Sequence, residues 1–204
     1  MAESSEIPAK TEESKAPAAE ALQPPPPKFR KILPKQDQAV GPTGATIPPH
    51  ICKIMIEAVR SGDLNRFNIE RSNYHVELRD IISDPASFSQ NLLFAATAIP
   101  DEDAALRIIE ILIESGVDLQ QKDSLKQTPL YYCARDGKSK LVQFFVEQGL
   151  NVNEIDTYGQ NAFFYSVNLG HLEVCKMLKA YGSEHDHVDD YQQTPIYYAI
   201  KSNK

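Results

Sequence analysis

Beyond the first 47 residues, apolar side chains recur at the three- and four-residue spacing of amphipathic helices. The first such stretch begins at Ile51 and ends at the Ser-Gly-Asp break over residues 61–63, and a second stretch follows with Leu64 and Phe67. Small and polar residues of this kind punctuate helices. The pattern therefore predicts a pair of short helices with a tight turn between them, within residues 48–83.

Turn residues in the C-terminal half repeat at an interval of 33 positions. Three residue types carry this period: Asp123, Asp156 and Asp189; Gly116, Gly149 and Gly182; Gln127, Gln160 and Gln193. A fixed period of this length predicts stacked units, each too small to bury its apolar face alone. We predict an all-α solenoid with units at residues 88–122, 123–155 and 156–188 and an incomplete unit at 189–204.

The unit at residues 123–155 carries the clearest local signals. Thr128 is expected to cap a first helix with its hydroxyl, and Pro129 follows in the first turn, where its missing N–H costs nothing. A second helix is predicted over residues 139–148, and Gly149 ends it in the left-handed conformation. Helices this short are marginal alone in water, so each must pack against a neighbouring unit.

These units resemble the ankyrin repeat, whose pattern runs D-x-x-G-x-T-P-L-H-x-A-A-x-x-G-H. The matching segments are DSLKQTPLYYCARDGK from Asp123, DTYGQNAFFYSVNLGH from Asp156 and DDYQQTPIYYAIKSNK from Asp189. The resemblance implies helix-turn-helix repeats with short hairpin turns, and a function in protein binding. It also implies that the helix pair within residues 48–83 is an N-terminal capping unit.

The unit at residues 88–122 is degenerate. Its Leu93 lies 37 positions before Leu130, whereas its Gly116 lies 33 positions before Gly149. Four residues are therefore inserted, and we place them in the turn between its two helices, near residues 99–104.

Two further departures from the family pattern are informative. The histidine of the pattern is replaced by Tyr131, Phe164 and Tyr197, so aromatic packing is expected in place of a histidine hydrogen bond between repeats. The unit at residues 156–188 has Asn-Ala at positions 161–162 in place of Thr-Pro, so its first helix is expected to begin less firmly.

The unit at residues 189–204 stops where its second helix would begin. Ile196, Tyr198 and Ile200 would then lie at an open end of the stack. We expect the chain to be part of a longer protein, with coverage of this end by a partner as the other interpretation. The corresponding alternative function is that of a targeting or regulatory arm of a catalytic protein, such as a modifying enzyme, whose active domain lies beyond Lys204.

Composition narrows the function classes. The formal net charge of −7 argues against general binding of nucleic acid, which needs a basic face. No stretch of about 18 apolar residues is present, so no membrane span is predicted, and the N-terminus does not have the pattern of a signal peptide. The three widely spaced cysteines, Cys52, Cys133 and Cys175, indicate free thiols in a reducing compartment. A cytoplasmic or nuclear protein is therefore expected.

Residues 1–47 contain few large apolar side chains and most of the prolines, so we predict a disordered tail. A basic patch at Lys28, Arg30, Lys31 and Lys35 raises the hypothesis of a nuclear import signal or an anionic docking site. The four prolines at 24–27 raise that of a ligand for an aromatic-lined groove. A flexible linker is the preferred interpretation of both.

Candidate chemistry is sparse. His185, Asp186 and His187, with two aspartates at 189 and 190, form the only cluster of metal-ligand residue types. A solvated turn is the preferred interpretation, because such a turn lacks the rigid second shell that a metal site needs. The sequence contains no P-loop, GxSxG, HExxH or kinase signature. We therefore predict a non-catalytic protein with no cofactor and no metal.

Partner binding is predicted at the hairpin tips and the concave face. The first candidate stripe, two positions after each repeat aspartate, is Leu125, Tyr158 and Tyr191. The second stripe, for which a core or half-core position is favoured, is Tyr132, Tyr165 and Tyr198. Polar neighbours expected to orient a partner are Gln127, Gln160, Gln193, Arg135 and Asn168. The chain is expected to act on protein partners, as a monomer or as a subunit of a hetero-complex.

Overall fold

The structure is a computed structural model that describes residues 29, 31–32, 47–81 and 89–204. Its elements are helices: α1 (Pro49–Arg60), α2 (Leu64–Tyr74), the short 3₁₀ helix η2 (Leu78–Asp80), α3 (Leu92–Thr97), α4 (Glu102–Glu114), α5 (Pro129–Arg135), α6 (Ser139–Gln148), α7 (Ala162–Leu169), α8 (Leu172–Ala180) and α9 (Pro195–Lys201). The prediction of an all-α solenoid is confirmed for this part of the chain.

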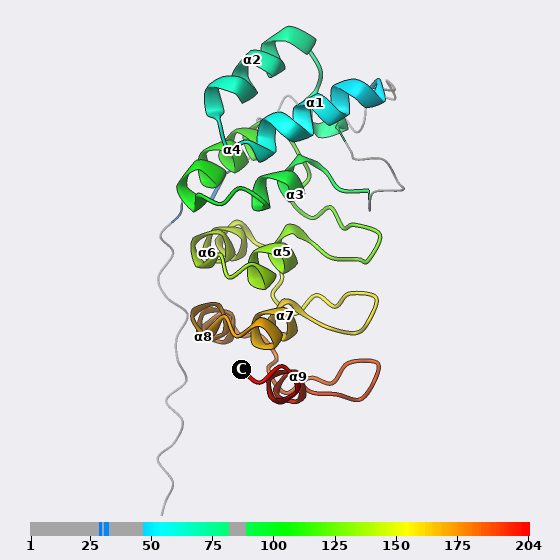
Figure 1. The fold of residues 1–204 in the computed structure, drawn as a ribbon, viewed down its shortest axis with the longest axis vertical. Coiled ribbons are helices and arrows are strands. Elements are labelled where there is room, and N and C mark those ends of the chain that lie inside the picture. Colours follow the sequence, from blue (N-terminus) through cyan, green and yellow to red (C-terminus); the bar gives the residue numbers. More distant parts are fainter. Residues whose placement is uncertain (1–28, 30, 33–46, 82–88) are drawn as a thin grey trace, which may run out of the picture.

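The helices form two parallel columns, and hairpin loops form a third (Figure 1). The first helices of the units, α3, α5, α7 and α9, pack on one another in the central column. The second helices, α4, α6 and α8, stack beside them. The α1–α2 pair contacts α3 and α4 and so covers one end of the stack.

A single apolar core runs through the stack from α1 to α8. Each unit up to residues 156–188 contributes fully buried side chains to it, for example Met55, Ile109, Leu130, Phe145 and Leu178. Full burial of a large apolar side chain contributes about 1.5–3 kcal/mol. Because the helices are only 6–13 residues long, this contribution comes from neighbouring units, and the stack is stable only as a whole.

The four inserted residues lie in α4, so the prediction that they lie in the turn is wrong. The starts of α3 and α4 are ten residues apart, as are the starts of α5 and α6 (102 − 92 = 139 − 129). In contrast, Gly116 lies 14 residues after the start of α4 and Gly149 lies 10 residues after the start of α6, a difference of four (116 − 102 = 14; 149 − 139 = 10). Four residues make about one helical turn. The insertion therefore lengthens the helix and leaves the apolar face of α4 in register.

Helix capping also differs from the expectation. The Thr128 hydroxyl is buried without a hydrogen-bond partner and does not cap α5. Asn161 caps α7 instead, because its Oδ1 accepts a hydrogen bond from Phe163 N at 3.1 Å. Its Nδ2 donates to the Glu184 carbonyl at 3.0 Å, so one side chain serves both a cap and a connection to the following loop. The expectation of a less firm start for α7 is therefore wrong.

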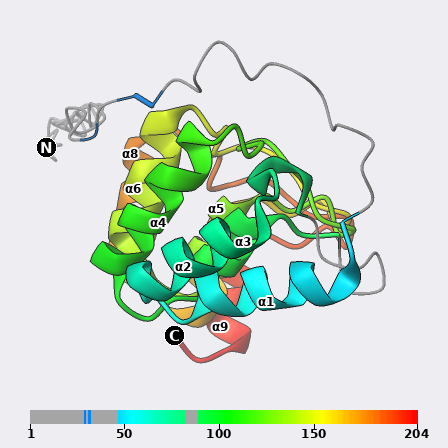
Figure 2. The same ribbon diagram turned by 90° about the horizontal axis from the view of Figure 1, so that it is seen from above.

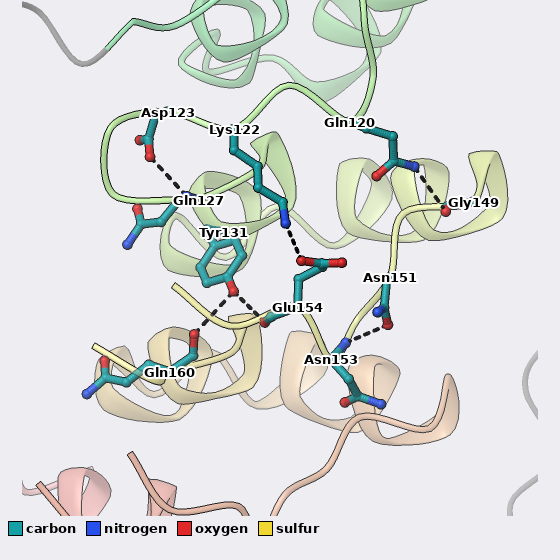
Figure 3. Close-up of polar contacts among 10 residues, drawn as sticks. All are labelled: Gln120, Lys122, Asp123, Gln127, Tyr131, Gly149, Asn151, Asn153, Glu154 and Gln160. Atoms are coloured by element: carbon teal, nitrogen blue, oxygen red, sulfur yellow. Dashed lines mark hydrogen bonds and ion pairs between the residues drawn. The ribbon is translucent and has the colours of Figure 1, made fainter. Parts of the chain in front are cut away.

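The position of the family histidine retains a hydrogen bond at Tyr131. Its buried hydroxyl lies within hydrogen-bonding distance of the Glu154 carbonyl and, at 3.1 Å, the Gln160 carbonyl (Figure 3). Both acceptors lie in the crossover to the next unit. The expectation that aromatic packing replaces the bond thus fails at Tyr131, while Phe164 at the equivalent position packs against His187 with ring centroids 6.2 Å apart.

A second periodic contact joins the first helices. Lys138 belongs to the unit that follows α3. Its Nζ donates hydrogen bonds to the carbonyl oxygens of Thr97 and Ile99 at the C-terminal end of α3, the latter at 2.7 Å. His171, which is 33 positions further, places Nε2 2.8 Å from the Arg135 carbonyl at the end of α5. Carbonyl groups at a helix C-terminus lack intrahelical partners. These side chains therefore supply partners across two steps of the stack, from α3 to α5 and from α5 to α7.

The last unit leaves apolar side chains accessible on α9. Ile196 is 67% exposed and Ile200 is 74% exposed, in agreement with the sequence-based expectation for these two residues. Tyr198 is half-buried, and its neighbour Tyr197 is exposed in its place. The tyrosine side chains alternate in this way because Tyr198 turns toward α7, where it contacts the Phe164 ring.

The predicted tail, residues 1–47, lies mostly outside the described residues, and so do the four prolines, Lys28, Arg30 and Lys35. Phe29 and Ile32 are described, and both pack against the core. Among the described residues, no helix is long and apolar enough to cross a membrane.

The capping difference gives a first test. Replacing Asn161 with Ala is expected to lower the free energy of unfolding by about 1–2 kcal/mol, because a cap is lost together with the bond to Glu184. Replacing Thr128 with Val is expected to be neutral or stabilising, because the hydroxyl is buried without a partner. Urea unfolding of both variants measures the difference. Equal losses at the two positions would contradict the assignment of the caps.

Candidate partner-binding surface

Each hairpin loop is held by the aspartate that begins it. In the loop at residues 156–160, Asp156 Oδ1 accepts hydrogen bonds from Tyr158 N at 2.8 Å and Gln160 N at 3.0 Å. The main chain closes the same loop, since Asp156 N donates to the Gln160 carbonyl at 2.9 Å. The loops that begin at Asp123 and Asp189 repeat these contacts (Figure 3 shows the bond from Gln127 N to Asp123). Each tip therefore has a fixed conformation.

The other oxygen of each aspartate joins two repeats. Asp156 Oδ2 accepts from Tyr165 Oη at 2.5 Å within its own unit and from Gln127 Nε2 at 2.9 Å in the preceding unit. Gln127 Nε2 also donates to Tyr165 Oη at 2.7 Å, which closes a three-membered network. The next network consists of Gln160, Asp189 and Tyr198, and an earlier one contains Asp123, Tyr132 and Gln90.

These networks raise the pKa of their tyrosines and lower the pKa of Asp189. Burial raises the pKa of Tyr165 above its ordinary value, and the hydrogen bond to Asp156 raises it further. For Tyr198, burial and the bond to Asp189 raise the pKa to about 12. Burial acts to raise the pKa of Asp189, but the hydrogen bonds from Tyr198, Gln160 and the loop N–H groups outweigh it and hold the pKa below its ordinary value.

The first candidate stripe lies along the hairpin tips. Tyr158 is 43% exposed and Tyr191 is 65% exposed, whereas Leu125 is half-buried. Adjacent tips are joined through the main chain. Thr157 N donates to the Leu125 carbonyl at 3.0 Å, and Asp190 N donates to the Tyr158 carbonyl at 3.1 Å. The structure therefore brings the three residues into one row.

The second stripe is half-buried, and its hydroxyl groups are bound within the stack. Tyr132, Tyr165 and Tyr198 each donate to an aspartate, at 2.7, 2.5 and 2.5 Å, and each accepts from a glutamine. The favoured core or half-core position agrees with this placement. These hydroxyls serve the joint between repeats and are not directed at a partner.

The polar candidates divide into two groups. Gln127 is buried and Gln160 half-buried, and both amide hydrogens of each are used in the networks. Their expected role of orienting a partner therefore gives way to a role in the stack. Gln193 occupies the equivalent place in the last unit, and its amide makes no hydrogen bond with any described residue.

Arg135 and Asn168 lie at the ends of first helices, apart from the hairpin tips. Arg135 is exposed, and its guanidinium carbon lies 4.7 Å from the centre of the Tyr132 ring, at cation–π distance. It also forms an ion pair with Asp136. Asn168 is half-buried and accepts a hydrogen bond from Ser202 Oγ in the next unit. Of the two, Arg135 has the more accessible side chain.

The two histidines of the candidate metal cluster pack on aromatic rings. His185 lies 6.4 Å from the Phe163 ring and His187 lies 6.2 Å from the Phe164 ring, centre to centre. His187 Nε2 is also 2.9 Å from the Gly159 carbonyl. Within the described ranges, no three His, Cys, Asp or Glu residues are arranged to hold a metal ion.

Sequence reasoning missed a second group of contacts, on the other side of the stack. Phe29 and Ile32 contact the second-helix column there, at α6. The 33-residue period contains no sign of this contact, because the segment lies outside the repeats. The only signal in the sequence is the presence of three large apolar residues, Phe29, Ile32 and Leu33, within a basic segment.

A matched pair of tyrosines tests the networks. Replacing Tyr165 with Phe is expected to lower the free energy of unfolding by about 1–3 kcal/mol, because Asp156 and Gln127 each lose a buried partner. Replacing Tyr158 with Phe is expected to change it by less than about 0.5 kcal/mol, since that ring is exposed. Chemical denaturation of both variants gives the comparison. A loss at Tyr158 equal to that at Tyr165 would contradict the network.

The low pKa of Asp189 predicts a pH dependence. A carboxylate whose pKa is depressed by folding stabilises the fold above its unfolded pKa of about 3.9, and this contribution is lost as the pH falls below that value. The difference in unfolding free energy between wild type and Asp189→Asn is therefore expected to shrink between about pH 6 and about pH 3. A difference that stays constant over this interval would refute the assignment.

Comparison with known proteins identifies the units. Residues 92–189 match the family model for ankyrin repeats (3 copies). No curated protein matches the chain significantly. The matched region covers α3 to α8 and ends at Asp189, so it includes the stacked helix pairs and two of the hairpin loops described above. From this match and the stacked helix-turn-helix units, residues 92–189 are identified as ankyrin repeats.

Proposed function

We propose that the chain is a non-catalytic adaptor that binds a partner protein through its hairpin tips and the adjoining concave face. Ankyrin repeats generally are protein–protein interaction modules and are typically non-catalytic. The observation that carries the proposal for this chain is the row of tip residues, in which Tyr158 and Tyr191 are exposed on loops of fixed conformation.

Fixed loops favour binding for an energetic reason. Ordering a flexible loop at an interface costs free energy, and this cost is avoided when the free protein already holds the bound conformation. Each tip here is held by two N–H bonds to an aspartate and by a main-chain bond to a neighbouring tip. Tyrosine is enriched among residues that contribute most to binding, because one ring supplies both apolar area and a polar group.

Polar groups near the tips add orientation. Gln193 has both amide donors available among the described residues, and it lies two positions after Tyr191. Arg135 offers an exposed guanidinium. In the proposed surface, Tyr158 and Tyr191 supply the anchors, Leu125 extends the apolar row, and these polar groups select the partner.

We propose a cytoplasmic or nuclear location. The support is the chemistry of Cys52, Cys133 and Cys175, which are all free thiols. Burial raises the pKa of each of the three thiols, so little of the reactive thiolate forms at neutral pH.

Capture of partners tests the proposed surface. The double variant Tyr158→Ala/Tyr191→Ala is expected to lose most of the proteins that cross-link to the wild-type chain in intact cells, because both anchors are removed. Mass spectrometry of the cross-linked material identifies and counts these proteins. The free energy of unfolding is expected to change by less than about 0.5 kcal/mol per site, since both rings are exposed.

Ile69→Ala is the matched control, because Ile69 is 59% exposed but lies on α2, away from the tips. This variant is expected to capture the same proteins as the wild type. Undiminished capture by the double tyrosine variant would refute the proposed surface. A further triple variant that adds Leu125→Ala then shows whether the half-buried leucine contributes.

A further inference from the structure

A short N-terminal segment contacts the outer side of the second-helix column. The Phe29 ring meets Phe144 of α6 edge to face, with ring centroids 5.3 Å apart and planes at 80°. Ile32 also packs against the core. Both described pieces of this segment lie beside the column formed by α4, α6 and α8 (Figure 2). The contact joins residues more than 110 positions apart in the sequence.

The main chain of the segment is bound as well. Phe29 N donates to Glu147 Oε2 at 2.7 Å, and Ile32 N donates to Gln148 Oε1 at 2.7 Å. Two side chains of one helix thus accept hydrogen bonds from two main-chain N–H groups three residues apart. Main-chain contacts of this kind give affinity, and the flanking side-chain contacts give specificity. Here the side chains that give specificity are the aromatic ring of Phe29 and the aliphatic side chain of Ile32, three positions later.

Lys31 adds a charge contact. A Cβ placed on Gly149 would lie 3.9 Å from Lys31 Nζ, so the ammonium group lies over the residue that caps the C-terminus of α6. The C-terminal end of a helix carries a partial negative charge and favours a cation. The segment is therefore bound by an aromatic contact, two hydrogen bonds and one favourable charge.

The acceptor on α6 is held in place by the stack. Glu147 Oε1 accepts from Gln143 Nε2 at 2.8 Å, one helical turn earlier, and from Tyr181 Oη of the next unit at 3.0 Å. Burial and the bond to Glu147 raise the pKa of Tyr181 to about 12, so it remains a donor at neutral pH. Because repeat-to-repeat contacts orient one oxygen of Glu147, the other is positioned toward Phe29.

We propose that these residues of α6, namely Phe144, Glu147, Gln148 and Gly149, form a second binding site. It takes a segment with an aromatic residue, an aliphatic residue three positions later and a basic residue between them. In this chain, Phe29, Lys31 and Ile32 occupy the site intramolecularly. The site lies on the opposite side of the stack from the hairpin tips, so it is independent of the proposed partner surface.

Because the chain's own segment occupies the site, this segment competes with any other ligand of the site. Residues 33–46 tether the segment to α1, and short tethers produce effective concentrations on the order of millimolar. A free segment of the same pattern must displace the tethered one, which weakens its apparent affinity. Release of the segment would expose Phe144, which is buried while the segment is bound.

A peptide competition experiment on the full chain tests the site. The probe is a fluorescent peptide with the sequence of residues 26–36, titrated with protein and followed by fluorescence anisotropy. The chain carrying Phe29→Ala and Ile32→Ala is expected to bind this peptide about tenfold more tightly than the wild type. This factor is the ratio of two values: the effective concentration of the tethered segment, about 1 mM, and the dissociation constant of the same sequence as a free peptide, about 0.1 mM.

The control chain carries Ile7→Ala and Leu22→Ala, which remove two apolar residues of the same N-terminal region outside residues 29–32. It is expected to bind the peptide as the wild type does. Adding Glu147→Ala to the Phe29/Ile32 variant is expected to abolish the gained affinity, with circular dichroism confirming that the chain is folded. Where that variant unfolds, a peptide with both Phe29→Ala and Ile32→Ala is the second measurement, and it is expected not to bind.

Three outcomes would overturn the proposal. In the first, the peptide binds the wild type and the Phe29/Ile32 variant with equal affinity. In the second, the peptide does not bind that variant at 1 mM. In the third, the doubly substituted peptide binds that variant as tightly as the original peptide does. The first shows that the chain's own segment does not occupy the site, and the other two show that the α6 surface does not recognise the aromatic and aliphatic pair.

Discussion

The buried aspartate at the start of each hairpin loop is the interaction on which the rest of the structure depends. Its two oxygens have separate tasks. In Asp156, Oδ1 fixes the tip by accepting two main-chain N–H groups, and Oδ2 accepts from Tyr165 and from Gln127 of the previous unit. A charged group is costly to bury unless it is fully hydrogen-bonded. Here that requirement couples the shape of each tip to the register of the stack.

This coupling explains how short helices support an exposed recognition row. Apolar burial supplies most of the stability but does not fix direction, because it is not directional. The aspartate networks supply the direction, since a shift of one unit against the next would leave a carboxylate without partners. Tyr158 and Tyr191 are consequently presented on adjacent hairpin tips that the main chain joins.

The sequence was sufficient to predict the architecture and insufficient to assign the side chains. The 33-residue period of Asp, Gly and Gln indicates repeats because each of these residue types has the same structural role in successive units. It does not distinguish a glutamine that faces a partner from one that faces the next unit, and Gln127 belongs to the second kind. The residue spacing in the sequence revealed an insertion but did not show that it lies in α4. One added helical turn preserves the spacing of apolar residues, so the pattern carries no sign of the longer helix. The contact of Phe29 with Phe144 lies outside any periodic signal.

Phe164 has a consequence for how the stack opens. Tyr131 ties the units at residues 123–155 and 156–188 together through the carbonyls of Glu154 and Gln160, but the phenyl ring at Phe164 has no hydroxyl with which to tie the following pair. The step between α7 and α9 therefore lacks this hydrogen bond, and local opening is expected to start there, at lower free energy than global unfolding. Tyr191 lies on the segment that opens first, so a ligand engaging it would slow amide exchange throughout α9.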